Sequence, residues 1–246
     1  MATSAIRNSN PSLDNVFFPG MAVLILATVF LGFAHTYYLA GVFRAPLPNL
    51  LIHIHGLVFS LWILLLILQA SLIAGGRIDI HRRVGLLGFG LGCLMVILGL
   101  MAATDSLARH AAPGEAGVAA KAFYAVPITD MLIFSTLIYF GFRNRLNPAA
   151  HKRLMLIATI TLLDAAFGRW PIHVPWWNLQ LAQMCCYVLL LMVMGYDLWS
   201  TGRVHRATVW ASVLLIVVQQ APVPLGRTEL WQSFATWAQN LVRSLH

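Results

Sequence analysis

Imidazole and carboxylate side chains occur at a similar depth in several apolar segments of this sequence. His55 lies near the start of the run 51–74, Asp130 within the run 122–142, and Asp164 within the run 154–172. Inside a membrane an ionisable side chain costs roughly 3 kcal/mol, so such groups usually face the interior of a helix bundle. Imidazole and carboxylate groups that meet there are common metal ligands. The sequence therefore predicts a metal site formed by His55, Asp130 and Asp164.

Further polar residues at this depth could complete a cofactor site. Arg169 would neutralise one of the two carboxylates, and a protonated histidine or a bound metal would balance the other. Since His53 and His55 lie about 160° apart around a regular helix, both can be ligands only if the helix begins after His53. The candidate cofactor-binding residues are His35, His53, His55, Arg169 and His173.

The helix that contains His55 continues with residues on the same face. His55, Phe59, Trp62, Leu66 and Gln69 are separated by four, three, four and three residues, the spacing of one helical face. Gln183 and Gln219 fall at a similar depth in the later runs 178–199 and 207–223. We therefore expect the cavity to be lined by Trp62, Gln69, Gln183 and Gln219.

The choice of cofactor lies between a metal ion and haem b. Haem b needs two histidines on facing helices, whereas a non-haem metal would use Asp130 and Asp164 directly, so the metal ion is the preferred interpretation. A retinal protein is excluded, because it needs a lysine in the last segment and the only lysines are Lys121 and Lys152. A membrane zinc hydrolase with two histidines on its last helix is disfavoured, since 207–223 contains no histidine.

These residues must be positioned by membrane-spanning helices. The chain is 59% hydrophobic and only 10% charged, whereas about a quarter of the residues in a soluble domain are charged. A helix of roughly 20 apolar residues spans a bilayer, and the sequence contains seven such runs. The predicted fold is all-α, an integral membrane bundle of seven transmembrane helices over residues 16–39, 51–74, 84–103, 122–142, 154–172, 178–199 and 207–223.

Basic residues concentrate in the loops on one side of the predicted bundle. Ten lie on the side of the amino terminus and six on the other, which places the amino terminus in the cytoplasm and the carboxyl terminus in the periplasm. The formal charge of +8 therefore reflects orientation in a bacterial inner membrane, and no nucleic-acid partner is expected. The ten are Arg7, Arg77, Arg82, Arg83, Arg143, Arg145, Lys152, Arg153, Arg203 and Arg206.

The end of the chain has a different pattern. Trp231, Phe234, Trp237, Leu241 and Leu245 recur at three- and four-residue steps, as in an amphipathic helix. With its tryptophans, such a helix is expected to lie flat on the outer membrane interface, in contact with lipid. The predicted organisation is a cytoplasmic segment 1–15, a transmembrane domain 16–223 and an interfacial helix within 224–246.

Two segments carry a family resemblance. "HIHGLVFSLWILLLILQASLIAGGRIDIHRRVG" and "NPAAHKRLMLIATITLLDAAFGRWP" contain a His-x-His-Gly motif and an Ala-His-Lys-Arg-Leu-Met motif. In both, the chain resembles a group of uncharacterised bacterial polytopic inner-membrane proteins, over roughly residues 50–175. The resemblance implies a multi-pass protein of the bacterial inner membrane and implies no activity.

Three functions are compatible with these features. The first is an integral membrane protein that binds a metal ion or haem in a periplasm-facing cavity, for redox chemistry on a lipophilic substrate such as a quinone or for metal handling. The second is a cofactor-free accessory subunit of a larger membrane complex. The third is a proton- or cation-coupled transporter. Transport needs access from both sides, and the apolar inner halves of the segments disfavour it unless a hydrophilic path passes through Gln69 and Asp197.

Overall fold

The computed structural model describes residues 11–46, 48–110, 112–172 and 179–244. Within these ranges the chain is helical and contains no strand. The elements in order are α1 (Pro11–Phe33), the π-helix η1 (Ala34–Tyr38), α2 (Ala40–Phe43), α3 (Leu50–Ala74), α4 (Ile78–Arg109), α5 (Gly114–Arg143), α6 (Pro148–Ile160), α7 (Asp164–Phe167), α8 (Leu179–Thr201), α9 (Arg206–Gln220), α10 (Pro222–Leu225) and α11 (Glu229–Arg243).

Six helical segments in the described part of the chain are long and apolar enough to cross a membrane. They are Leu13–Tyr38, Leu50–Ala74, Ile78–Arg109, Gly114–Arg143, Leu179–Thr201 and Arg206–Leu225. The predicted all-helical, multi-pass membrane character is confirmed. Six of the seven expected runs correspond to these segments.

The remaining expected run, 154–172, does not form one helix. It is divided between α6, which has 13 residues and ends at Ile160, and α7, which has four residues and begins at Asp164. In the turn between them, hydrogen bonds join residues three apart, from the nitrogen of Leu162 to Thr159 and from that of Leu163 to Ile160. Asp164 then accepts a hydrogen bond from the nitrogen of Ala165 through its own carboxylate, 2.6 Å away. Such local side-chain bonds compete with a continuous helix.

Side-chain caps mark where several helices begin. Asn49 caps α3 by accepting from the nitrogen of Ile52 at 2.9 Å, and Asn147 caps α6, whose first residue is a proline. His205 and Thr228 cap α9 and α11 in the same way. A cap satisfies one of the backbone N–H groups that a helix start leaves free. These residues fix where each helix enters the bundle.

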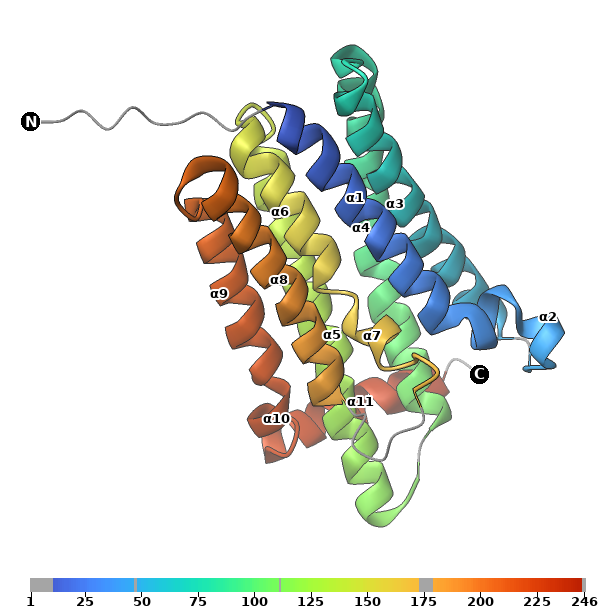
Figure 1. Ribbon diagram of the computed structural model, residues 1–246. Helices are drawn as coiled ribbons and strands as arrows, with labels where there is room; N and C mark the ends of the chain where they lie inside the picture. Colours follow the sequence, from blue (N-terminus) through green and yellow to red (C-terminus); the bar gives the residue numbers. More distant parts are fainter. Residues whose placement is uncertain (1–10, 47, 111, 173–178, 245–246) are drawn as a thin grey trace, which may run out of the picture.

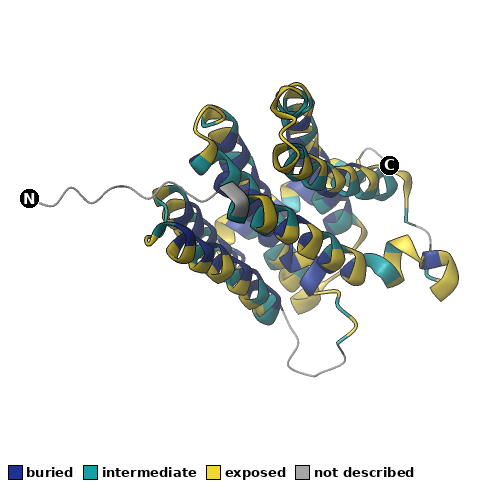
Figure 2. Cartoon of the chain, turned by 45° about the horizontal axis from the view of Figure 1, so that its top comes forward, coloured by how far each residue is buried: buried dark blue, intermediate teal, exposed yellow. Residues whose placement is uncertain are grey.

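The helices form one bundle with α6 in its interior. In Figure 1 the α3–α4 hairpin lies on one flank, α8 and α9 lie on the other, and α1, α5 and α6 lie between them. The helices turn buried residues inward and exposed residues outward (Figure 2). The centre of the core contains Phe134 from α5, Ile157 and Ile160 from α6, and Leu215 from α9, all at most 1% exposed. The packing therefore surrounds the break between α6 and α7.

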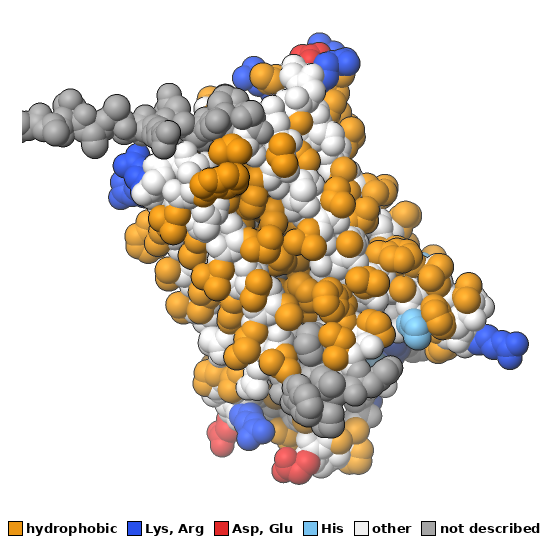
Figure 3. Space-filling view, viewed as in Figure 1, with side chains coloured by type: hydrophobic (Ala, Val, Ile, Leu, Met, Phe, Trp, Pro, Cys, Tyr) orange, Lys and Arg blue, Asp and Glu red, His pale blue; other side chains and the backbone are white. Residues whose placement is uncertain are grey.

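The outer surface has the pattern of a membrane protein. Apolar side chains cover the flank seen in Figure 3, and lysines and arginines gather at its two ends. Leu86 and Leu87 on α4 and Trp210 on α9 are all more than 60% exposed. Patches of this kind are a liability in water, but lipid tails cover them in a bilayer. We call the end with the α3–α4, α5–α6 and α8–α9 loops the basic end, and the opposite end the α11 end.

Helix α11 runs across the bundle at the α11 end instead of along it (Figure 1). It is fastened to α5 and α4 by two side chains: the indole of Trp231 donates to the oxygen of Lys121 at 2.7 Å, and the amide of Gln239 donates to that of Leu107 at 2.9 Å. Its opposite face leaves large apolar side chains exposed, at Leu230, Phe234, Trp237 and Leu241. The predicted tail 224–246 thus contains a helix with one packed face and one open apolar face.

Candidate functional site

Two carboxylates lie near each other in the interior of the bundle. Asp130 on α5 is 7% exposed and Asp164 at the start of α7 is 2% exposed, and their charges are close enough to repel each other. Each has one buried oxygen without a hydrogen-bond partner in the described part of the chain, Oδ1 of Asp130 and Oδ2 of Asp164. We call these two residues the carboxylate pair. Most buried polar atoms in proteins are satisfied, so this pair is unusual.

Two glutamines that were expected to line the cavity, Gln183 and Gln219, border the carboxylate pair. The amide of Gln219 on α9 lies against Asp130, and the side chain is 1% exposed. Neither atom of this amide has a hydrogen-bond partner among the described residues. The amide nitrogen of Gln183 on α8 donates to the backbone oxygen of Gln219 at 3.4 Å. Asp130, Asp164, Gln183 and Gln219, four residues from four helices, therefore meet in one place.

Arg169 is the charged neighbour of the pair, but it forms no ion pair with either carboxylate. Its charge acts on Asp164. Its guanidinium donates to the backbone oxygen of Ala165 at 2.7 Å and lies 5.0 Å above the ring of Phe33. The three ion pairs within the described residues involve other arginines and lysines. The expected neutralisation by Arg169 is therefore partial.

His55 also lies within reach of the charge of Arg169. Its Nδ1 is buried and has no partner in the described ranges, and its ring centroid is 4.0 Å from that of Phe59. The backbone of Leu98 and the charge of Arg169 are its polar surroundings. No group of three or more histidine, cysteine or acidic side chains is placed to hold a metal ion in the part of the chain that the structure describes. Arg169 is thus a charged neighbour of both His55 and Asp164.

The remaining candidate histidines are placed with aromatic residues. His35 in η1 is exposed and stacks on Phe43, with ring centroids 3.6 Å apart. His53 is half-buried, and its backbone oxygen accepts a hydrogen bond from the hydroxyl of Tyr37 at 3.1 Å. His173 lies outside the described residues. Of the candidate histidines that the structure describes, His35, His53 and His55, it places His55 near Arg169.

Trp62 and Gln69 lie along α3 towards the basic end. The indole of Trp62 donates to the hydroxyl of Thr159 at 3.1 Å in the core and so ties α3 to α6. Gln69 is 14 residues beyond His55, about 21 Å along the helix. With its amide oriented to suit both neighbours, it donates to the oxygen of His81 and accepts from the nitrogen of Gly85. These hydrogen bonds join Trp62 to α6 and Gln69 to α4, and they do not involve the carboxylate pair.

A second buried acidic site was not predicted. Asp197 on α8 and Arg153 on α6 are 0% and 1% exposed, and Nε of Arg153 donates to Oδ1 of Asp197 at 2.8 Å. The other carboxylate oxygen accepts from the hydroxyl of Thr208 at 2.6 Å and from the nitrogen of His205 at 3.0 Å. We call these four residues the Asp197 cluster. Arg153 was expected among the loop cations; the only sequence signal was an aspartate within the apolar run 178–199.

His205 in this cluster is held in its neutral form. Its Nδ1 accepts from the nitrogen of Ala207 at 3.1 Å, which a protonated ring nitrogen cannot do. Burial lowers the pKa of His205 from its ordinary value, and the nearby charge of Arg153 lowers it further. The residue acts as the cap of α9.

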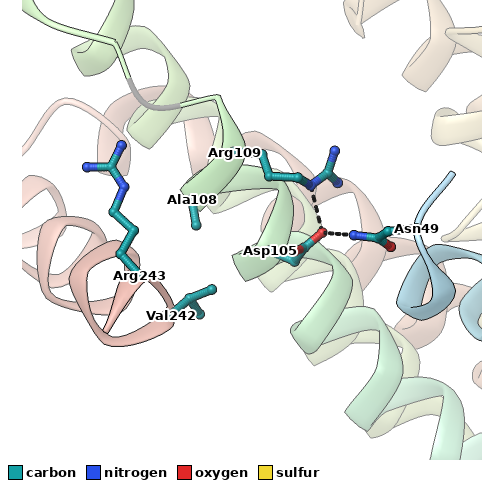
Figure 4. A pocket seen from close by; sticks show the side chains of 6 residues that line it. All are labelled: Asn49, Asp105, Ala108, Arg109, Val242 and Arg243. Atoms are coloured by element: carbon teal, nitrogen blue, oxygen red, sulfur yellow. Dashed lines mark hydrogen bonds and ion pairs between the residues drawn. The ribbon is translucent and has the colours of Figure 1, made fainter. Parts of the chain in front are cut away.

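Two described pockets lie at the α11 end, away from the carboxylate pair. The larger, of about 360 Å³, is lined by Asn49, Asp105, Ala108, Arg109, Val242 and Arg243. Figure 4 shows its polar wall: Oδ2 of Asp105 accepts from Nε of Arg109 at 2.8 Å and from the amide of Asn49 at 3.1 Å. This carboxylate joins the end of α4 to the start of α3, a structural role.

No protein-family model, no curated protein and no solved structure matches this chain. Function is therefore inferred from the residues themselves.

Proposed function

We propose that this protein is a proton-coupled transporter of the bacterial inner membrane, with the carboxylate pair as its proton-binding site. The observation that carries the proposal is the pair itself: two neighbouring buried carboxylates, Asp130 and Asp164, each with an oxygen that has no hydrogen-bond partner among the described residues. A buried carboxylate without a cation is far more costly than a neutral acid. Two carboxylates that share such a site share a proton. The site is thus suited to hold a proton and to release it when its surroundings change.

The break between α6 and α7 supports a transport role. Transporters commonly bind their coupling ion near the bilayer midplane, where a membrane helix is interrupted. Residues 148–167 of α6, the turn and α7 number about 20, enough to span roughly 30 Å of hydrocarbon. We propose that they cross the membrane as a seventh, discontinuous segment. Asp164 would then sit at the interruption.

The proposed orientation follows from the loops. The basic end faces the cytoplasm under the positive-inside rule, so the amino terminus is cytoplasmic and the carboxyl terminus periplasmic. Helix α11 then lies at the periplasmic interface, where its exposed side chains Phe234 and Trp237 contact lipid.

The Asp197 cluster removes the main argument against transport. An apolar cytoplasmic half would have barred a proton, but Arg153, Asp197 and Thr208 form a buried polar site there. Polar groups therefore exist on both sides of the middle of the bundle.

A metal ion at the same site is the second candidate. Asp130, Asp164 and Gln219 supply three oxygens without partners among the described residues. Oxygen ligands suit a hard divalent cation such as Mg²⁺ or Mn²⁺. Haem b fits less well, because its iron needs a histidine that faces open space and the ring of His55 is packed against Phe59. No contact among the described residues favours quinone redox chemistry or an accessory-subunit role over these two candidates.

A hydrophobic carbodiimide tests the proposal, because it reacts with protonated carboxylic acids in apolar surroundings and not with carboxylates in ion pairs. We expect labelling at Asp130 or Asp164, located by mass spectrometry of the purified protein, and a fall in labelling as the pH rises. Asp197 is the internal control, since its ion pair with Arg153 keeps it unreactive. Asp130→Asn and Asp164→Asn should each reduce the label.

Elemental analysis of the same samples separates the two candidates. A stoichiometric divalent ion that protects the pair from labelling would favour the metal site. An unlabelled pair without a metal would refute both candidates. If labelling is found, proteoliposomes with an internal pH reporter and an imposed potential should show proton uptake that Asp130→Asn abolishes.

A further inference from the structure

We infer that a buried row of three polar residues on α9, Thr208, Ser212 and Gln219, is the path that connects the carboxylate pair to the basic end. We call these residues the polar row. The inference rests on the proposed function, since it names the route by which protons would reach the pair. Ser212 then has a role in the path, although nothing in the sequence pattern marks this residue.

The three side chains share one face of α9. They are separated by four and seven residues, and steps of four and seven keep residues on one side of a helix. All are at most 1% exposed, so this face is turned inward along its whole length. At about 1.5 Å of rise per residue, the row covers roughly 17 Å of the bundle.

Each end of the row meets one of the two buried acidic sites. At the lower-numbered end, the hydroxyl of Thr208 donates to Asp197 at 2.6 Å. At the other end, the amide of Gln219 lies against Asp130. The row therefore joins the Asp197 cluster to the carboxylate pair through a single helix.

Ser212, in the middle, is unlike the other buried hydroxyls. A serine or threonine inside a helix usually donates to the backbone oxygen three or four residues earlier. Ser200 and Thr129 do so at 2.7 and 2.9 Å. The hydroxyl of Ser212 is buried and has no partner within the described residues. Leaving a buried hydroxyl unpaired lowers stability, so alanine would be the more stable residue here.

The spacing of the row suits transfer through hydrogen-bonded water. Thr208 and Ser212 are about 6 Å apart along the axis, a gap that one water molecule with two hydrogen bonds can span. Between Ser212 and Gln219 the fully buried Leu215 intervenes, and there proton transfer must wait for water to enter. The hydroxyls of Thr208 and Ser212 and the intervening waters each accept one proton and release another, while the amide of Gln219 orients the last water by hydrogen bonds, so no group of the row gains or loses charge over the full relay.

Hydrogen–deuterium exchange at the carboxylate pair tests the path. Infrared spectroscopy of the purified protein detects a protonated carboxylic acid by its carbonyl band, which shifts when D₂O replaces H₂O. We expect Ser212→Ala to slow this shift by roughly tenfold or more, the effect of removing one hydrogen-bonded step of about 1.4 kcal/mol. Ser212→Thr, which keeps a hydroxyl, should retain most of the rate.

The matched control is Thr136→Val on α5, which also removes one hydroxyl but lies off the row, where Thr136 donates to the oxygen of Leu132. It should exchange at the wild-type rate. Exchange in Ser212→Ala that is as fast as in the wild type would refute the path while leaving the proton site intact. A wild-type protein with no protonated carboxyl band would instead refute the proposed function, so the two failures can be told apart.

Discussion

Two acidic sites lie inside this bundle, and they are built in opposite ways. Asp197 has a positive partner in Arg153, and both of its oxygens accept hydrogen bonds. Asp130 and Asp164 have each other as neighbours, and each has an oxygen with no partner in the described ranges. Since the same chemical group is buried in both places, the difference lies only in what surrounds it.

That difference separates a structural site from a functional one. A satisfied buried charge pair holds helices in register, and its loss leaves an uncompensated charge. An unsatisfied polar group lowers stability and persists where it serves another purpose, such as binding an ion. We therefore expect substitutions at the Asp197 cluster to act on stability, and substitutions at the carboxylate pair to act on proton binding.

Breaking the ion pair between Arg153 and Asp197 should change the free energy of unfolding the most. Arg153→Met should lower the free energy of unfolding by about 3–5 kcal/mol, because Asp197 is then buried without its cation. Arg143→Met, at an exposed arginine at the end of α5, is the control and should change stability by at most about 0.5 kcal/mol. Thermal unfolding in detergent measures both. If Arg153→Met is as stable as Arg143→Met, the ion pair does not stabilise the fold, and the two acidic sites do not differ in the way described.

The next effect concerns the support of α7. A Cβ at Gly32 on α1 would lie 2.3 Å from the backbone oxygen of Ala166, so the two backbones pack in direct contact. Gly32→Ala should cost about 1–3 kcal/mol and should also change carbodiimide labelling at Asp164 by displacing α7. Gly20→Ala, on the same helix, has no atom within 4 Å of its Cβ and should not destabilise. A harmless Gly32→Ala would mean that α7 can shift freely.

The spans and the polar residues of the carboxylate pair could be predicted from sequence, because both depend on local pattern. Apolar length gives the membrane segments, and the rarity of polar side chains in them singles out Asp130, Asp164, Gln183 and Gln219. The structure places these four together. The depth of each residue, estimated from the rise per helical residue, was sufficient to group these four, because their helices run side by side.

The rest could not be predicted, because it depends on contacts between distant segments. Arg153 stands next to Lys152 in a string that resembles a cytoplasmic loop, and its partner Asp197 is 44 residues away. The interruption of the helix after Ile160 could not be predicted, because no glycine or proline occurs there. Gln69 was expected in the cavity because it shares a face of α3 with His55. A 25-residue helix reaches the opposite end of the bundle, however, and there Gln69 meets His81.

The same substitution, aspartate to asparagine, can be made at both acidic sites, and its effects on stability should differ. Asp130→Asn should leave stability within about 1 kcal/mol of the wild type or raise it, because it removes one of two repelling charges. Asp197→Asn should destabilise, because Arg153 then lacks its buried counter-charge. Denaturant or thermal unfolding gives both values. A destabilised Asp130→Asn beside an unaffected Asp197→Asn would reverse the assignment of the two sites.

The smallest effect is a pH dependence at the edge of the Asp197 cluster. The folded pKa of His205 lies below its ordinary value of about 6.5, owing first to burial and then to Arg153. The unfolded chain therefore binds the proton more readily, so the stability that this cap contributes is present above about pH 6.5 and is lost as the pH falls through the folded pKa. His205→Asn keeps a capping oxygen that does not titrate. It should weaken the loss of stability between about pH 7 and pH 5, measured by thermal unfolding. If the variant shows the wild-type pH dependence, protonation of His205 does not open the cluster, and the cap of α9 is independent of the charge on its imidazole.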